Sequence, residues 1–182
     1  MLNAPQALDF LSDGHGIISY GGAFMFKKLL TTRSLCASAV IAALYAALTL
    51  LLAPISYGSI QCRVSEALTL LPMMTPAAIP GLFVGCILAN ILGGCSLWDV
   101  IFGSLATLIA AFGTYVLRKK PALAALCPVV ANGLIVGAVL SYVWGLPLWL
   151  TMAEVAIGEV GAVLIGFVLL RALKKVELNR FL

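Results

Sequence analysis

Eight charged or amide side chains interrupt the apolar runs of this chain, and their chemistry gives the first indication of a functional site. They are Gln61, Arg63, Glu66, Asn90, Asp99, Asn132, Glu154 and Glu159. Inside a lipid bilayer an ionisable side chain costs at least about 2.5–3.5 kcal/mol on insertion scales, so such residues commonly mark functional sites. Carboxylate, guanidinium and amide groups together offer donors and acceptors to a polar solute. These residues are therefore the first candidates for function.

The composition places these residues in a membrane. Of the 182 residues, 63% are hydrophobic and 10% are charged, and the mean hydropathy is +1.13. Soluble domains average about 45–50% apolar and about 25% charged residues. A water-soluble fold of this size cannot hide so much apolar surface in one core, whereas lipid can surround it. We predict an all-α integral membrane protein in contact with the lipid bilayer.

The apolar stretches are numerous enough for a bundle of about six transmembrane helices. They cover residues 35–55, 64–74, 77–92, 97–117, 122–142 and 148–173. Pro72 and Pro76 interrupt the second stretch, so we expect that helix to be kinked or only partly spanning.

Three clusters of basic residues predict the orientation. They are Lys27, Lys28 and Arg33 before the first stretch, Arg118, Lys119 and Lys120 after the fourth, and Arg171, Lys174, Lys175 and Arg180 around the end of the sixth. With six crossings all three clusters fall on one side, which the positive-inside rule makes cytoplasmic. Both termini are then cytoplasmic, in a cell (plasma) membrane. The pI of about 8.9 follows from these clusters and does not indicate nucleic-acid binding.

The polar residues converge on the outer side under this orientation. Outer helix ends carry four of them: Arg63, Glu66, Asn90 and Asp99. Glu154 lies about two turns into the last helix and Glu159 near its middle. Apart from Arg171 of the last basic cluster, the inner halves of the stretches carry no acidic or basic residue. We predict a capture pocket that opens outward and is closed toward the cytoplasm.

Structural alternatives exist for several of these residues. Arg63 and Glu66 are three apart, a spacing that also allows a pair on one helix face. Asp99 fits a helix N-terminus, where the helix dipole stabilises a carboxylate. Glu154 and Glu159 are five apart and do not share a face, so one can point to the pocket while the other holds a neighbouring helix.

Aromatic residues gather near the expected outer surface. Tyr142, Trp144 and Trp149 fit an aromatic belt that needs no further function. Tyr57 and Trp98 lie on turns beside the polar cluster, and we expect these two to stack on a planar ligand.

Small residues recur at a spacing of four in three places, a pattern that lets another helix approach closely. The positions are Ala39, Ala43 and Ala47 in the first stretch, Gly81 and Gly85 in the third, and Gly133 and Gly137 in the fifth. Either packing within the bundle or a contact with another subunit accounts for each set.

Motifs for energy coupling, metals and catalysis are absent from the sequence. There is no G-x-x-x-x-G-K-[ST] phosphate loop, so an ATP-driven pump built on this chain would need separate ATPase subunits. The lone histidine, His15, has no partners at ligand spacing, and no C-x-x-C pair occurs among the five cysteines. We expect no metal, no cofactor and no catalytic residue. The sequence is compatible with a disulfide between Cys62 and Cys95 and also with two free thiols.

The segment Ala53-Pro54-Ile55-Ser56-Tyr57-Gly58-Ser59-Ile60-Gln61-Cys62-Arg63-Val64-Ser65-Glu66-Ala67-Leu68-Thr69-Leu70-Leu71-Pro72 resembles the signature of the QueT-type queuosine-precursor transporters. These are substrate-binding (S) components of energy-coupling factor (ECF) transporters. The resemblance extends over most of residues 33–175, which we expect to form the substrate-binding domain. Residues 1–32 are expected to be a cytoplasmic leader with Met25 as the natural start, and residues 176–182 a cytoplasmic tail.

The resemblance implies a six-helix bundle that binds its substrate near the outer surface, under the turn at residues 56–63. It also implies that Ala39, Ala43 and Ala47 dock onto a transmembrane coupling subunit driven by two ATPase subunits. The implied ligand is a 7-deazaguanine: the 7-aminomethyl or 7-cyano precursor of queuosine, or the base queuine.

The residues expected to bind this substrate are Tyr57, Gln61, Arg63, Glu66, Asn90, Trp98, Asp99, Glu154 and Glu159. A guanine-like edge presents two adjacent N–H donors, which Glu66 or Glu154 would accept. Arg63, Gln61 or Asn90 suits the ring carbonyl, and Asp99 or Glu159 suits a cationic aminomethyl group.

Two alternative functions are compatible with the sequence. One is an S component for a different vitamin or nucleobase-like solute. The other, an intramembrane enzyme, needs a nucleophile with its base or a metal cluster at the pocket, and neither is visible in the sequence.

Overall fold

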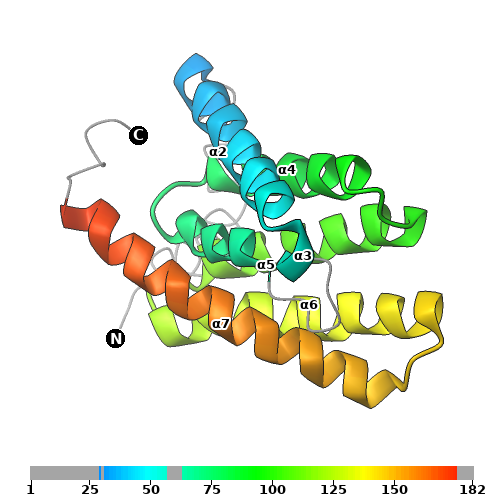
Figure 1. Ribbon diagram of the computed structural model, residues 1–182. Helices are drawn as coiled ribbons and strands as arrows, with labels where there is room; N and C mark the ends of the chain where they lie inside the picture. Colours follow the sequence, from blue (N-terminus) through cyan, green and yellow to red (C-terminus); the bar gives the residue numbers. More distant parts are fainter. Residues whose placement is uncertain (1–28, 30, 57–62, 176–182) are drawn as a thin grey trace, which may run out of the picture.

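The computed structural model describes residues 29, 31–56 and 63–175, and within them every regular element is helical (Figure 1). In chain order the elements are α2 (Thr32–Leu51), α3 (Ala53–Ser56), η1 (Val64–Met73), α4 (Ala78–Leu92), η2 (Asp99–Gly103), α5 (Ser104–Val116), α6 (Pro121–Trp144) and α7 (Leu148–Lys175). The predicted leader, the tail, Tyr57, Gln61 and Cys62 lie outside the described residues.

Four segments among the described residues are long and apolar enough to cross a membrane: Thr32–Leu51, Asp99–Val116, Pro121–Trp144 and Leu148–Lys175. The other two predicted stretches form η1 and α4, of 10 and 15 residues. The all-helical membrane class is therefore confirmed for the described residues. Six full crossings and cytoplasmic termini remain predictions.

The 3₁₀ helix η1 lies at the centre of the helical packing. Its residues from Ser65 to Pro72 are all buried, and it contacts α2, α4, α5, α6 and α7. Runs of 3₁₀ helix longer than three or four residues are uncommon because their hydrogen-bond geometry is poorer than that of an α-helix. Pro72, which has no N–H to donate, lies inside η1. The proline-rich second stretch is thus a short buried helix, as its partly spanning character predicted.

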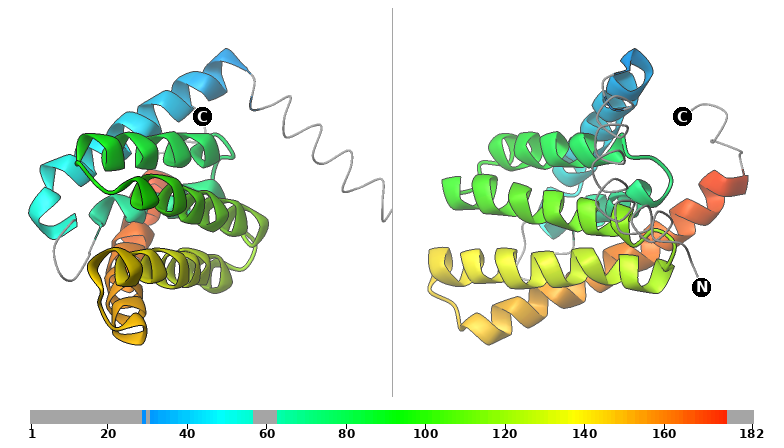
Figure 2. Two further views of the ribbon diagram at one scale, coloured as in Figure 1. Left: turned by 90° about the vertical axis from the view of Figure 1, so that its right-hand side faces the viewer. Right: turned by 180° about the vertical axis from the view of Figure 1, so that it is seen from behind.

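Three of the remaining helices form a layer, and two others cross it. Helices α4, α5 and α6 run side by side, while α2 crosses α4 and α7 crosses η1 and α6 obliquely (Figures 1 and 2). The turns α4–α5 and α6–α7 lie at one end of the bundle, and the α5–α6 turn lies at the other end with the last residues of α7 (Figure 1). This arrangement places the basic residues that follow α5 and those that end α7 together.

Two of the three small-residue sets serve packing within the chain. Gly81 and Gly85 of α4 face α2, where a Cβ added at Gly85 would lie 2.9 Å from the carbonyl oxygen of Ala42. Gly137 of α6 faces α7, with only 2.6 Å between an added Cβ and the Cα atom of Met152. The third set differs, because Ala39, Ala43 and Ala47 are all exposed.

We predict that Gly85→Ala destabilises the protein, because its new methyl group would collide with the backbone of α2. Overpacking of this kind costs about 1–3 kcal/mol, and a chain of this length loses about 2–4 °C in Tm per kcal/mol. The measurement is thermal unfolding of the detergent-purified protein. Gly103→Ala is the matched control, because its nearest contact would be an ordinary 3.4 Å to the Asn90 side chain. Equal Tm values for the two variants would contradict the tight α2–α4 contact.

Candidate functional site

A small enclosed cavity lies where η1, α6 and α7 meet. It is lined by Arg63, Glu66, Asn132, Val136, Val155 and Glu159. Its volume is about 10 Å³, which is room for one water molecule at most. Three residues predicted from the sequence to bind substrate, Arg63, Glu66 and Glu159, are therefore brought together here.

Glu66 is held from two other helices. Its Oε1 atom accepts a hydrogen bond from the hydroxyl of Tyr45 on α2 and lies 3.3 Å from Oγ1 of Thr107 on α5, whose single hydrogen also faces the Gly103 carbonyl at 3.1 Å. The Tyr45 and Glu66 side chains are fully buried. The second oxygen, Oε2, has no hydrogen-bond partner among the described residues. One half of the carboxylate is thus fixed, and the other half remains available to accept.

Glu159 and Asn132 form the opposite part of the cavity. The Asn132 amide nitrogen donates to Oε1 of Glu159 at 2.9 Å. Within the described part of the chain, Oε2 of Glu159 and Oδ1 of Asn132 have no hydrogen-bond partner. Buried acceptors without partners are rare in proteins and call for an explanation such as an absent ligand or water. Residues of one cavity therefore carry three unsatisfied acceptor oxygens, counting that of Glu66.

Arg63 and Cys86 connect the cavity to α4 and α5. The Arg63 Nη1 atom lies 4.0 Å from the Sγ atom of Cys86. The same sulfur receives contacts at 3.5 Å from the Asn90 amide and from the Thr107 hydroxyl. Asn90 also donates to the backbone carbonyl of Asp99 at 3.1 Å. Asn90 therefore holds the start of η2 and does not line the cavity.

Three other predicted residues lie apart from this cavity. Asp99 is buried at the start of η2, where its Oδ2 accepts from the Ser96 hydroxyl at 2.7 Å and its backbone N–H donates to the same hydroxyl at 3.2 Å, a pairing found at helix N-termini. Trp98 stacks on Phe102 with ring centroids 5.8 Å apart and meets Tyr142 edge-on. Glu154 is half-buried and is absent from the cavity lining. Their roles in substrate binding stay predictions, as do those of Tyr57 and Gln61.

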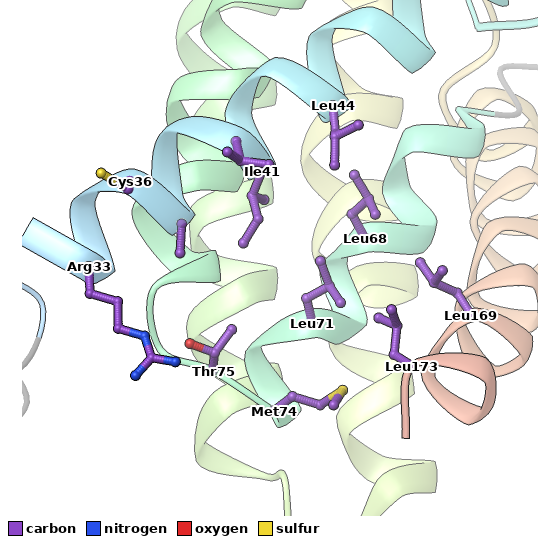
Figure 3. Close-up of a pocket in the computed structure, with 12 residues that line it drawn as sticks. Arg33, Cys36, Ile41, Leu44, Leu68, Leu71, Met74, Thr75, Leu169 and Leu173 are labelled. Atoms are coloured by element: carbon purple, nitrogen blue, oxygen red, sulfur yellow. The ribbon is translucent and has the colours of Figure 1, made fainter. Parts of the chain in front are cut away.

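Three larger spaces on the described surface are apolar. One, of about 490 Å³, includes Trp98, Phe102 and Tyr142, and another, of about 460 Å³, lies between α5 and α6. The third, of about 430 Å³, lies between α2, η1 and α7, and Figure 3 shows Leu68 and Leu71 across from Leu169 and Leu173. Such surfaces suit lipid chains or apolar partners, since they offer few groups to a polar solute.

Tyr45, Cys86 and Thr107 belong to the polar network but were not predicted from the sequence. Each lies in an apolar stretch and belongs to a residue type that is common in helix cores. The sequence offered one signal, the polar pair Tyr45 and Thr49 one turn apart in the first stretch, and the structure shows both residues buried. Among the described residues no group of three or more His, Cys, Asp or Glu side chains can hold a metal ion.

The cavity can bind a solute by hydrogen bonds and charge. Two carboxylates, one guanidinium and one amide surround it, and this set favours a ligand that presents several N–H or O–H donors. A fused two-ring base does not fit into about 10 Å³. Binding of such a ligand therefore requires η1, α6 and α7 to separate locally, or their side chains to rearrange.

The fold and the site define a multi-pass membrane protein with an enclosed polar cavity inside its helical bundle. The family model of the QueT transporter matches residues 35–175, and the chain belongs to the QueT transporter family. It is 43% identical over 74 residues to the queuosine precursor transporter QueT of Lactococcus lactis subsp. cremoris (strain MG1363). That alignment covers 39% of this chain and 43% of the relative, less than half of its length. No solved structure matches the chain significantly.

We predict that Tyr45→Phe destabilises the protein by removing a hydrogen bond from the buried Glu66 carboxylate. A hydrogen bond to a charged group contributes about 1.5–3 kcal/mol, which corresponds to about 2–4 °C in Tm per kcal/mol. Thermal unfolding in detergent is the measurement. Tyr142→Phe removes a hydroxyl from a tyrosine that is 76% exposed and serves as the control. If both variants melt with the wild type, the Tyr45 hydroxyl does not support Glu66.

Proposed function

We propose that this protein is the substrate-binding S component of an ECF-type importer and captures a queuosine precursor of the 7-deazaguanine class. Two facts support the proposal together: the QueT family match over residues 35–175, and the unsatisfied acceptor oxygens of Glu66, Asn132 and Glu159 around one buried cavity. The name of the Lactococcus relative supplies the substrate class. The protein acts as a transport subunit and not as an enzyme.

The chemistry of the ligand agrees with the cavity. The edge of a guanine-type ring carries two adjacent N–H donors, and a carboxylate accepts such a pair well. Glu66 offers Oε2 to one of these N–H groups, because its Oε1 already faces Tyr45 and Thr107. Arg63 supplies donors for the ring carbonyl in the same cavity. An S component for a different vitamin would need another donor pattern.

Calorimetric titration of the detergent-purified full chain tests the substrate class. We expect tight binding of 7-aminomethyl-7-deazaguanine and no tight binding of guanine or riboflavin. Glu66→Gln should weaken binding at least about tenfold, because one acceptor of the ring edge becomes an N–H donor.

The control for this titration is Glu177→Gln, which removes a carboxylate from the predicted tail. Its binding should equal that of the wild type. If folded wild-type protein binds no deazaguanine, the proposed substrate class is wrong. If Glu66→Gln binds like the wild type, the proposed site is wrong.

The proposed partners are a transmembrane coupling subunit and two ATPase subunits. Ala39, Ala43 and Ala47 form an exposed stripe on α2, whereas the glycine stripes of α4 and α6 are used inside the chain. A stripe of small residues on the lipid-exposed side lets a foreign helix approach closely. We assign this stripe to contact with the coupling subunit, in a cell membrane with both termini in the cytoplasm.

We predict that Ala43→Trp prevents co-purification with a co-expressed ECF module and abolishes uptake of labelled substrate by the cells. The bulky ring would hold the partner helix away from α2. Leu88→Trp is the matched control, because Leu88 is an exposed residue on α4, outside the stripe. Unchanged co-purification of Ala43→Trp would exclude the stripe as the docking face.

A further inference from the structure

The charged groups around the cavity do not balance. Two carboxylates, Glu66 and Glu159, and one guanidinium, Arg63, are the ionisable groups in its lining. Their exposed fractions are 1%, 6% and 7%, so the molecule screens them from water. With all three ionised, the cavity carries one excess negative charge. A buried carboxylate without a counter-charge is costly, and a bound cation would remove that cost.

The hydrogen bonds indicate where the excess charge lies. Glu66 accepts from two hydroxyl groups, those of Tyr45 and Thr107. The bond to Glu159 comes from the Asn132 amide, and Oε2 of Glu159 is without a partner among the described residues. Glu159 therefore has the weaker support of the two carboxylates. It also lies on α7, across the cavity from η1, which carries Glu66 and follows Arg63 directly.

We propose that the cavity selects a solute with one positive charge, whose ammonium group pairs with Glu159 while Oε2 of Glu66 accepts an N–H group of the ring edge. This inference rests on the proposed function and makes it more specific. Among 7-deazaguanines it favours those with a cationic aminomethyl-type substituent over the neutral 7-cyano compound. The ligand is larger than the cavity of about 10 Å³, so the proposal requires Glu66, Glu159 and Arg63 to stay around the ligand when the cavity opens.

The physical reason for this selectivity is the difference between the two substituents as donors. An ammonium group forms a charge-assisted hydrogen bond with a carboxylate, roughly twice as strong as a neutral one. A nitrile has no N–H to donate and would leave Oε2 of Glu159 unsatisfied and its charge uncompensated. Leaving a buried acceptor unpaired is the stronger source of discrimination.

The experiment is calorimetric titration of the purified full chain with 7-aminomethyl- and 7-cyano-7-deazaguanine. The wild type should bind the aminomethyl compound at least about tenfold more tightly than the cyano compound. Glu159→Gln should remove this preference, through weaker binding of the aminomethyl compound and unchanged or tighter binding of the cyano compound. Glu66→Gln should weaken both ligands, and Glu177→Gln should weaken neither.

The outcomes separate this inference from the proposed function. Equal or tighter binding of the cyano compound by the wild type overturns the charge selectivity and leaves the proposed substrate class standing. A preference that survives in folded Glu159→Gln overturns the role of Glu159. Binding of neither compound by folded wild type overturns the proposed function itself. The comparison of the two ligands on the wild type requires no variant, so it tests the charge selectivity even if Glu159→Gln does not fold.

Discussion

The burial of the Glu66 carboxylate constrains the positions of the helices around it. A carboxylate within a bundle of apolar helices is tolerated only where other groups donate hydrogen bonds to it. Those donors are Tyr45 of α2 and Thr107 of α5, so both helices must lie against η1. Helix η1 can reach this central place because it is short and buried along its length from Ser65 to Pro72. The groups that satisfy Glu66 therefore also hold α2 and α5 against η1.

The sequence predicted the helices well, because hydrophobic length and helix-breaking residues are local signals. The expected stretch at residues 122–142 corresponds to α6 (Pro121–Trp144). Pro72 indicated an interrupted second stretch, which forms the short helix η1. The charged members of the cavity were predictable too, since Glu66 and Glu159 are rare groups in apolar surroundings. Tyr45 and Thr107 were not, because their importance depends on which helix lies opposite them. Trp98 shows the same limit: its turn borders the polar cluster in sequence, yet its ring packs on Phe102.

Small residues at a spacing of four have two different uses in this chain, and the sequence alone does not separate them. Gly85 and Gly137 lie at helix crossings where an added Cβ would come within 3 Å of a neighbouring helix. Ala43 has the same spacing to its neighbours but lies on the exposed side of α2. The difference is which side of the helix faces the bundle. On α2 the inward side carries Ile41, Tyr45 and Thr49, and the bond from Tyr45 to Glu66 is one of its contacts. The alanine stripe lies on the other side of the helix and is exposed.

The small volume of the cavity, about 10 Å³, means that a solute the size of a fused two-ring base could enter only if the surrounding helices or side chains moved. On α7, Glu159 lies between two tight contacts: Met152 against Gly137 of α6 and Gly166 against the backbone of Ala67 in η1, where an added Cβ would come within 2.6 Å of the carbonyl oxygen. Close-packed contacts of this kind resist sliding, because cores switch between discrete packings and do not deform continuously. A 3₁₀ helix has weaker hydrogen bonds than the α-helices around it. Because η1 carries Glu66, any displacement of η1 that opened the cavity would move Glu66 relative to Tyr45 of α2. Binding of a solute would then alter the contact between Glu66 and Tyr45 of α2, the helix that carries the exposed alanine stripe.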